Sequence, residues 1–221
     1  MRLPRFDAAG GAPQGEVELA PTKIVGIGVN YRAHAVEMGK PLPEEPLMFL
    51  KPPSALLAPG AAIPRPGGFE RVDFEGELGV VIGRRASRVS RGSALEHVLG
   101  YACVNDVTVR DLQKRDGQWA RAKGFDGFCP VGPRIVSGLD PTALRIVTRV
   151  NGVVRQDSNT SDLIFDVATL IAFVSEHMTL EVGDLISTGT PSGVGNLTPG
   201  DLVEIEIEGV GVLGNPVVAR A

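Results

Sequence analysis

The stretch VDFEGELGVVI, residues 72–82, has the pattern of a buried strand but carries two glutamates near its start. Its β-branched and apolar residues run up to a turn, as the residues of strands do. Glu75 and Glu77 are two positions apart, and side chains at positions i and i+2 of a strand point to the same face. Two neighbouring carboxylates repel each other, and moving either one out of water costs free energy.

Three arrangements would make this pair tolerable. The strand could lie at the edge of a sheet with both glutamates facing solvent, where charged side chains are usually found. The two carboxyl groups could share a proton and act as acid and base. A divalent cation could also lie between them. The stretch by itself leaves all three arrangements open.

The composition excludes several classes of function. The chain has 221 residues, of which 43% are hydrophobic and 22% charged, and its formal net charge is -4. Lys and Arg are scattered, so we expect no nucleic-acid partner, and no apolar run is long enough to span a membrane. The first residues lack the apolar core of a secretion signal, and Cys103 and Cys129 are the only cysteines. We therefore expect a cytoplasmic protein with two buried thiols.

Turn-forming residues are frequent, since the chain has 28 glycines and 17 prolines. With little helical periodicity, this favours many short strands joined by tight turns. We expect an α+β, mostly β fold in a single domain of residues 1–221, with a strand or hairpin over residues 1–20 and the core over residues 21–221. Helices are expected over residues 31–38, 106–115 and 165–177. Strands are expected over residues 23–29, 47–51, 72–82, 98–105, 134–136, 144–150, 153–157, 185–189 and 202–208.

Polar residues near the strand ends form several candidate sites. Gly26-Ile27-Gly28 lacks the third glycine of a dinucleotide fingerprint, because Tyr31 occupies its place, so nucleotide binding is disfavoured. His34 and Glu37 share a face of the helix expected there, so Glu37 could hold one imidazole nitrogen and leave the other free as a base. The alternative is a chance pair on a surface helix.

Asp106 follows an apolar strand and is either a helix cap or a third carboxylate beside Glu75 and Glu77. Three carboxylates without His or Cys partners suit Mg²⁺ or Mn²⁺ rather than Zn²⁺. Lys123 lies among glycines and aromatic residues, in a segment that could equally be a surface loop. The stretch TGTPSGVG, residues 188–195, could hold an anion with its backbone amides and hydroxyls, or could be only a turn.

These motifs together resemble the fumarylacetoacetate hydrolase family, in the same order and over roughly residues 20–215. The resemblance implies a mixed β-sandwich or β-roll with a few peripheral helices, a homodimer, and a Mg²⁺ or Mn²⁺ site made by Glu75, Glu77 and Asp106. It is carried by DFEGEL at residues 73–78, by residues 101–113, by AKGFD at residues 122–126, by residues 188–195, by GVNY at residues 28–31 followed by His34 and Glu37, and by residues 151–160.

The resemblance also implies roles for single residues in one catalytic domain. His34 and Glu37 would form a dyad on a mobile lid helix that activates water, and Lys123 would supply positive charge to a developing oxyanion or enolate. The substrate would be a β-keto acid whose 2-oxo group and carboxylate chelate the metal. Substrate contacts would come from Arg110, Gln113, Thr190 and Lys51.

Three functions are consistent with this set of residues. The first is hydrolysis of the carbon–carbon bond of an acylpyruvate, or decarboxylation of oxaloacetate, by one metal-dependent enzyme. The second is isomerisation or decarboxylation of hydroxymuconate-type intermediates of aromatic catabolism. The third, from another class, is a non-catalytic β-domain that binds a metal or small molecule. A binding module has no need of the pair of His34 and Glu37, which favours an enzyme.

Overall fold

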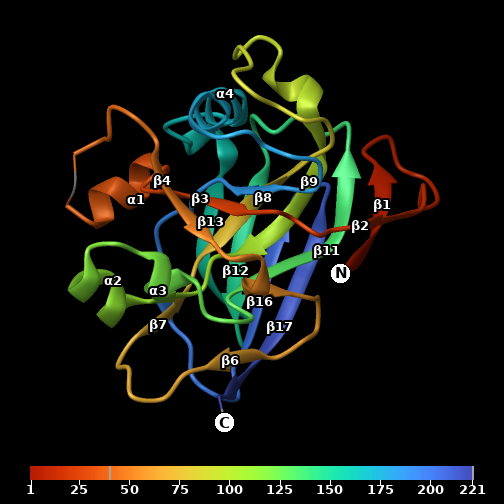
Figure 1. Cartoon of the computed structure of the whole chain (residues 1–221). Coiled ribbons are helices and arrows are strands. Elements are labelled where there is room, and N and C mark those ends of the chain that lie inside the picture. Colours follow the sequence, from red (N-terminus) through yellow and green to blue (C-terminus); the bar gives the residue numbers. More distant parts are fainter. Residues whose placement is uncertain (40, 221) are drawn as a thin grey trace.

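The computed structural model describes residues 1–39 and 41–220 and is built mainly of strands in three sheets, with short helices around them (Figure 1). The expected mostly β fold is confirmed. The largest sheet has the order β2 (Glu16–Glu18), β1 (Arg2–Asp7), β11 (Cys129–Ser137), β9 (Val98–Asn105), β8 (Gly76–Ile82), β14 (Leu185–Ser187), β3 (Ile24–Gly28) and β4 (Leu47–Lys51), with β5 (Leu56–Leu57) beside β11.

Two smaller sheets complete the fold. The five-stranded sheet has the order β13 (Val153–Asn159), β12 (Arg145–Val150), β16 (Leu202–Ile207), β17 (Gly211–Ala219) and β6 (Ile63–Arg65). The three-stranded sheet contains β10 (Thr108–Val109), β7 (Val72–Phe74) and β15 (Gly195–Asn196). The helices are α1 (Arg32–Glu37), α2 (Arg110–Asp116), α3 (Ala120–Lys123) and α4 (Val167–His177), and the 3₁₀ turns are η1 (Pro53–Ala55), η2 (Ala94–His97) and η3 (Thr160–Asp162).

The largest hydrophobic core joins the big sheet, the five-stranded sheet and α4. Alternate residues of β8, Leu78, Val80 and Ile82, enter this core, whereas Val81 points to the other face of the sheet. That other face is covered by N-terminal residues such as Leu3. Both faces of β8 are therefore buried, which explains why its sequence is apolar at almost every position.

Most expected elements are present, and the differences have local causes. The expected strand over residues 72–82 is two strands, because the chain leaves the three-stranded sheet after β7 and enters the large sheet at β8. The helix expected over residues 106–115 begins only at Arg110, since Thr108 and Val109 pair with β7. Strand β17 was not expected, and it pairs with both β16 and β6.

Cys103 and Cys129 are buried and free, as expected from the sequence. Among the described residues, no helix is long and apolar enough to cross a membrane.

The Gly26-Ile27-Gly28 segment on β3 has a packing role. Gly26 pairs directly with Phe49 of β4, and a Cβ atom on Gly26 would lie 2.1 Å from the Phe49 ring. A Cβ atom on Gly28 would lie 2.6 Å from the ring of Trp119. The two aromatic rings contact each other edge to face, with centroids 5.4 Å apart. The glycines therefore provide room for an aromatic pair.

Gly26→Ala should lower the free energy of unfolding by about 1–3 kcal/mol, because the new methyl group overpacks the Phe49 ring. Gly67→Ala is the matched control, since Gly67 is exposed and has no atom within 4 Å of the new Cβ position. Urea unfolding of the two variants measures the difference. Equal stability of the two variants would show that Phe49 moves aside without cost.

Candidate active site

Glu75, Glu77 and Asp106 lie together in the interior. Glu75 connects β7 to β8, Glu77 is on β8, and Asp106 follows β9, the neighbour of β8. The Asp106 backbone N–H donates to the Glu75 carbonyl oxygen at 2.9 Å, which fixes the two residues side by side. One carboxylate oxygen of each residue lies within 4.8 Å of the others. The three residues are at most 5% exposed. The alternative in which both glutamates face solvent on an edge strand is therefore wrong.

Buried cations surround two of the three carboxylates. Lys123 Nζ donates to Glu75 Oε2 at 2.8 Å and to Asp106 Oδ2 at 2.5 Å. Lys51 Nζ donates to Asp106 Oδ1 at 2.5 Å. Arg110 Nη2 donates to Glu75 Oε1 at 2.5 Å. Asp106 is thus an ion-pair partner and no helix cap, because α2 is capped at Val109.

The two glutamates have opposite electrostatic surroundings. Burial opposes ionisation of Glu75, but the charges of Lys123 and Arg110 outweigh it and hold the pKa of this carboxyl below its usual range. The pKa of Glu77 is raised, first by burial and then by the negative charges of Asp106 and Glu75. Glu77 is therefore the group whose ionisation depends most on an additional positive charge.

Lys123 is buried on the short helix α3, so the surface-loop interpretation is wrong. Burial favours its neutral form, but Asp106 and Glu75 outweigh burial and raise the pKa of this amine. Its Nζ atom also lies 4.7 Å from the centroid of the Phe49 ring, a cation–π contact. Lys123 therefore remains an ammonium group and supplies positive charge.

The donor set fits a small divalent cation. Glu77 Oε2 accepts hydrogen bonds from Ser187 Oγ and the Gly189 backbone N–H, at 2.6 and 2.8 Å, which orients the carboxylate. A recess of about 20 Å³ lies against Glu75, Glu77 and Lys123. Since one water-sized particle needs about 10–15 Å³, the recess can hold a single ion. Carboxylate oxygens are the ligands preferred by Mg²⁺ and Mn²⁺.

His34 and Glu37 lie beside this recess and interact directly. His34 Nδ1 is 2.9 Å from Glu37 Oε2, and Glu37 Oε1 accepts a hydrogen bond from the Gly193 backbone N–H at 3.1 Å. The His34 side chain is buried and lines the recess, whereas the Glu37 side chain is 41% exposed, so the pair lies at the boundary between the recess and the surface. The pairing leaves Nε2 as the imidazole nitrogen available to a ligand.

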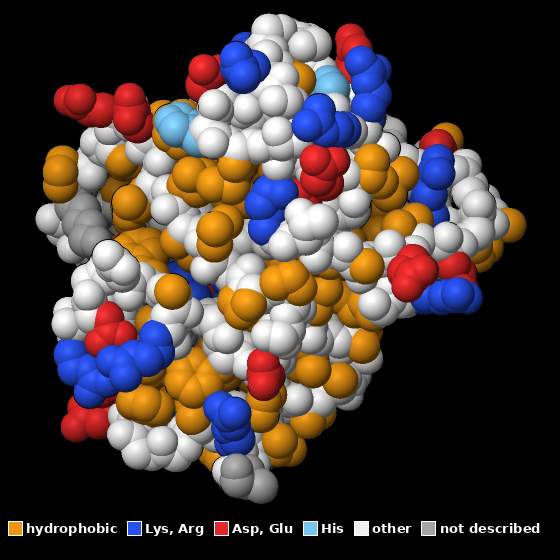
Figure 2. All heavy atoms as spheres, viewed as in Figure 1, with side chains coloured by type: hydrophobic (Ala, Val, Ile, Leu, Met, Phe, Trp, Pro, Cys, Tyr) orange, Lys and Arg blue, Asp and Glu red, His pale blue; other side chains and the backbone are white. Residues whose placement is uncertain are grey.

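A larger cavity of about 530 Å³ opens outward from the recess and is lined by residues of α1 and α2 and by Trp119. Figure 1 shows α1 and α2 on the same side of the molecule, and Figure 2 shows the surface hollowed between them. The recess and the cavity share His34, Met38, Arg110, Gln113 and Trp119, so they form one continuous site. Trp119 was not among the expected site residues. Its position as the single tryptophan, four residues before Lys123, was the available signal.

Gln156, also not among the expected site residues, closes a ring of hydrogen bonds around Gly76. The Gly76 N–H donates to Gln156 Oε1 at 3.1 Å, Gln156 Nε2 donates to Thr190 Oγ1 at 2.8 Å, and Thr190 Oγ1 donates to the Gly76 carbonyl at 2.9 Å. Gly76 separates Glu75 from Glu77, so this ring fixes the spacing of the two carboxylates. The Thr190 hydroxyl thus both donates and accepts within the ring, and Thr190 also lines the recess.

The chain is similar to known proteins over most of its length. The family model described as fumarylacetoacetate (FAA) hydrolase, C-terminal, matches residues 23–218. An oxaloacetate tautomerase of Bacillus subtilis is 44% identical over 211 residues, covering 89% of this chain and 70% of the relative.

Two solved structures are similar over most of the chain. The 5-carboxymethyl-2-hydroxymuconate delta-isomerase of Mycobacterium smegmatis has a TM-score of 0.87 at 46% identity, covering 96% of this chain and 87% of that chain. The maleylpyruvate hydrolase of Sphingobium sp. SYK-6, in complex with manganese(II) ion and pyruvate, has a TM-score of 0.81 at 38% identity, covering 92% of this chain and 72% of that chain.

The opposite surroundings of the two glutamates predict stability changes of opposite sign in the presence of chelator. At neutral pH, Glu77→Gln should raise the free energy of unfolding by about 1 kcal/mol, because it removes an unpaired buried charge. Glu75→Gln should lower it by about 2 kcal/mol, because Lys123 and Arg110 lose a charged partner. Urea unfolding in EDTA measures both, and each variant is the matched control for the other.

The pH dependence follows from the two pKa directions. A raised pKa destabilises the folded state as pH rises, so the gain from Glu77→Gln should be absent near about pH 4 and grow toward neutral pH. A lowered pKa stabilises the folded state until acid protonates the group, so the loss from Glu75→Gln should vanish in acid. Added Mn²⁺ should stabilise the unmutated protein and neither variant. Changes of the same sign in EDTA would contradict this electrostatic assignment.

Proposed function

The chain belongs to the fumarylacetoacetate hydrolase family, and we propose that it is a metal-dependent enzyme that hydrolyses a carbon–carbon bond of a small β-keto acid such as an acylpyruvate. One observation carries the proposal: the buried triad of Glu75, Glu77 and Asp106 lies at the inner end of a cavity that also contains His34 paired to Glu37. We further propose, from the family resemblance, a homodimer located in the cytoplasm.

Glu75, Glu77 and Asp106 would hold Mg²⁺ or Mn²⁺, and the manganese-bound maleylpyruvate hydrolase supports a metal of this kind. When bound, such an ion would polarise the 2-oxo group of the substrate and stabilise negative charge that develops there. The positive charge of the ion would also offset the cost of burying the Glu77 carboxylate and its repulsion by Asp106 and Glu75.

His34 is the group proposed to activate water. With Nδ1 held by Glu37, Nε2 can take a proton from a water molecule, whose oxygen adds to the distal carbonyl carbon of the acylpyruvate. The bond between this carbon and the adjacent CH2 group then breaks, and the acyl part leaves as a carboxylic acid. The electron pair of the broken bond forms the enolate of pyruvate, and a proton returned by His34 gives pyruvate. The Glu37 carboxylate stabilises the imidazolium form that exists between the two proton transfers.

The remaining residues hold the site and its charge. Lys123 remains protonated and would stabilise the enolate electrostatically, together with its support of Glu75 and Asp106. Arg110 orients Glu75 from the other side. The rings of Phe49 and Trp119 cover Lys123, which reduces access of bulk water to the charged groups.

Tautomerisation of oxaloacetate is a second candidate reaction, favoured by the similarity to an oxaloacetate tautomerase over 89% of this chain. It needs the same enolate and a proton transfer at carbon, but no attack by water. His34 could move that proton between carbon and solvent. Isomerisation of a hydroxymuconate-type acid would use the same step, and the similar delta-isomerase supports it in the same way.

The proposal predicts that loss of acetylpyruvate requires both a divalent metal and His34. In ultraviolet assays with Mg²⁺ or Mn²⁺, His34→Ala should lower kcat/KM by about 10²–10⁴-fold, the usual contribution of general acid–base catalysis, and EDTA should abolish turnover. His177→Ala is the matched control, because His177 is exposed at the end of α4.

Oxaloacetate distinguishes the competing reactions. Its enol–ketone interconversion is followed by ultraviolet absorbance, and its decarboxylation by pyruvate formation in a coupled assay. Accelerated interconversion without loss of acetylpyruvate would replace hydrolysis by tautomerisation, and formation of pyruvate from oxaloacetate would indicate a decarboxylase. If the protein binds metal but turns over neither compound, the remaining candidate functions are the isomerase and the non-catalytic binding domain.

A further inference from the structure

Arg110, which the family resemblance assigns to the substrate, makes three hydrogen bonds inside the protein and also lines the recess and the cavity. Its Nε atom donates to Asp73 Oδ2 at 2.8 Å, Nη1 to Gln113 Oε1 at 2.8 Å, and Nη2 to Glu75 Oε1 at 2.5 Å. Each nitrogen of this guanidinium group already has an acceptor. Arg110 therefore holds Glu75 and Gln113 and has at most two N–H groups left for a substrate, so a second anionic group in the cavity would depend mainly on other donors.

Arg71 and Lys114 are the other two cations that line the 530 Å³ cavity. Arg71 Nε donates to Asp73 Oδ1 at 2.8 Å, while its two terminal nitrogens have no hydrogen-bond partner among the described residues. Lys114 forms no ion pair within the described part of the chain, and it is exposed one helical turn after Arg110. Both side chains thus have free donors at the cavity.

The backbone of Arg71 is fixed to the first turn of α2, the helix that also carries Arg110 and Lys114. The Arg71 N–H donates to Asp111 Oδ2 at 3.0 Å, and its carbonyl accepts from the Arg110 N–H at 2.9 Å. The buried carboxylate of Asp73 accepts hydrogen bonds from the guanidinium groups of Arg71 and Arg110, and its negative charge offsets the repulsion between them.

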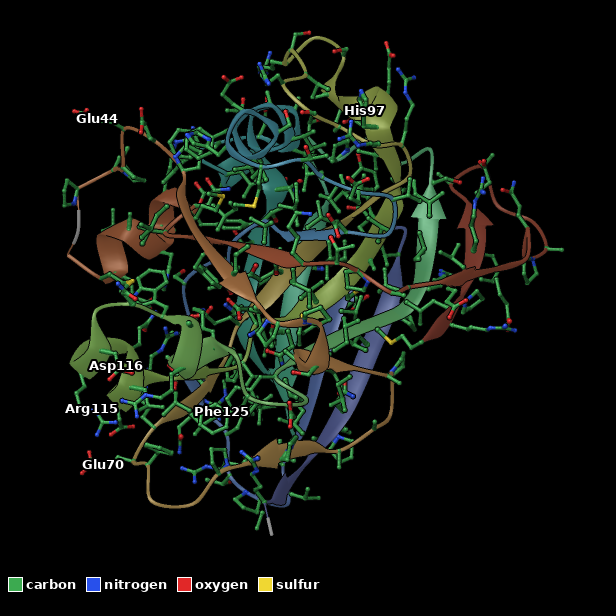
Figure 3. The ribbon with its side chains drawn as sticks, in the orientation of Figure 1. Glu44, Glu70, His97, Arg115, Asp116 and Phe125 are labelled. Atoms are coloured by element: carbon green, nitrogen blue, oxygen red, sulfur yellow. The ribbon has the colours of Figure 1, made fainter. Side chains whose placement is uncertain are left out.

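The charge of the cavity wall favours an anion. Three cations line it, against one carboxylate, Glu37, which already accepts from the Gly193 N–H and pairs with His34. Glu70 precedes Arg71 in the chain but lies at the periphery of the molecule, on the loop before β7 (Figure 3). Met38, Trp119 and Val194 make the remaining wall apolar.

We infer that Arg71 and Lys114 bind a second carboxylate at the far end of the substrate, so that the site selects 2-oxo dicarboxylates over 2-oxo monocarboxylates. This inference rests on the proposed function, which places the 2-oxo carboxylate end in the recess. An apolar carbon chain would run past Trp119 to the cations at the mouth. Free guanidinium and ammonium donors are suited to a carboxylate.

A binding experiment tests the inference without turnover. The ligands are 2-oxoglutarate and 2-oxopentanoate, which have the same chain length and differ only in the terminal carboxylate. Titration calorimetry of the Mn²⁺-loaded protein should give a tighter Kd for 2-oxoglutarate. Arg71→Gln and Lys114→Gln should each reduce this preference by roughly threefold to tenfold, as expected for a charge-assisted contact partly screened by water, and leave the Kd of 2-oxopentanoate unchanged.

Arg115→Gln is the matched control, because Arg115 follows Lys114 on α2 but does not line the cavity and pairs with Asp116. It should keep the preference, whereas 0.5 M salt should weaken the preference in the unmutated protein. Equal affinity for the two ligands, absence of binding by both, or a preference that survives in the double variant would overturn the inference. A normal preference in a protein that hydrolyses neither acetylpyruvate nor maleylpyruvate, an acylpyruvate with two carboxylates, would overturn the proposed hydrolysis and retain the carboxylate site.

Discussion

The structure depends on the balance of charge between buried carboxylates and buried cations. Asp73, Glu75 and Asp106 each have a cationic partner within hydrogen-bonding distance, supplied by Arg110, Lys51 and Lys123. Glu77 has only neutral donors, Ser187 and Gly189. Burial of an unpaired carboxylate is costly, and Glu77 is the one carboxylate of this network without a cationic partner among the described residues. A divalent cation held by Glu75, Glu77 and Asp106 would supply that partner, which is a physical reason for two glutamates two positions apart in a buried strand.

The same network explains why the fold brings distant segments together. Lys51 ends β4, Lys123 ends α3 and Asp106 follows β9, yet all three converge on one group of atoms. Each carboxylate is oriented from at least two directions, because Gln156 and Thr190 fix the Gly76 peptide while Arg110 and Lys123 fix Glu75. Ligands held in this way lose little freedom when an ion binds, and such supporting contacts commonly tune metal affinity.

Short-range patterns predicted much of the site. The two-residue spacing of Glu75 and Glu77 and the three-residue spacing of His34 and Glu37 describe neighbours within one segment, so the sequence could indicate both pairs. The contact of Gln156 with Gly76 joins residues 80 positions apart. The contact of Gly28 with Trp119 likewise depends on tertiary packing. The break between β7 and β8 was missed for the same reason, since both strands have apolar alternation and only the sheet partners differ. The family resemblance ordered these residues, but it did not reveal that each guanidinium nitrogen of Arg110 already donates to a protein acceptor.

The division of protonation states determines which residue can act as the base. Lys123 is held as an ammonium group by Asp106 and Glu75, and Glu75 is held as a carboxylate by Lys123 and Arg110. These groups stabilise charge because they keep their own charge fixed. Among the described residues at the recess, His34 combines an imidazole nitrogen free of protein partners with a carboxylate, Glu37, that can stabilise its protonated form. In the proposed reactions, the fixed charges at the inner end would stabilise the enolate and His34 at the cavity would transfer its proton, and both hydrolysis and tautomerisation need these two tasks to be separate.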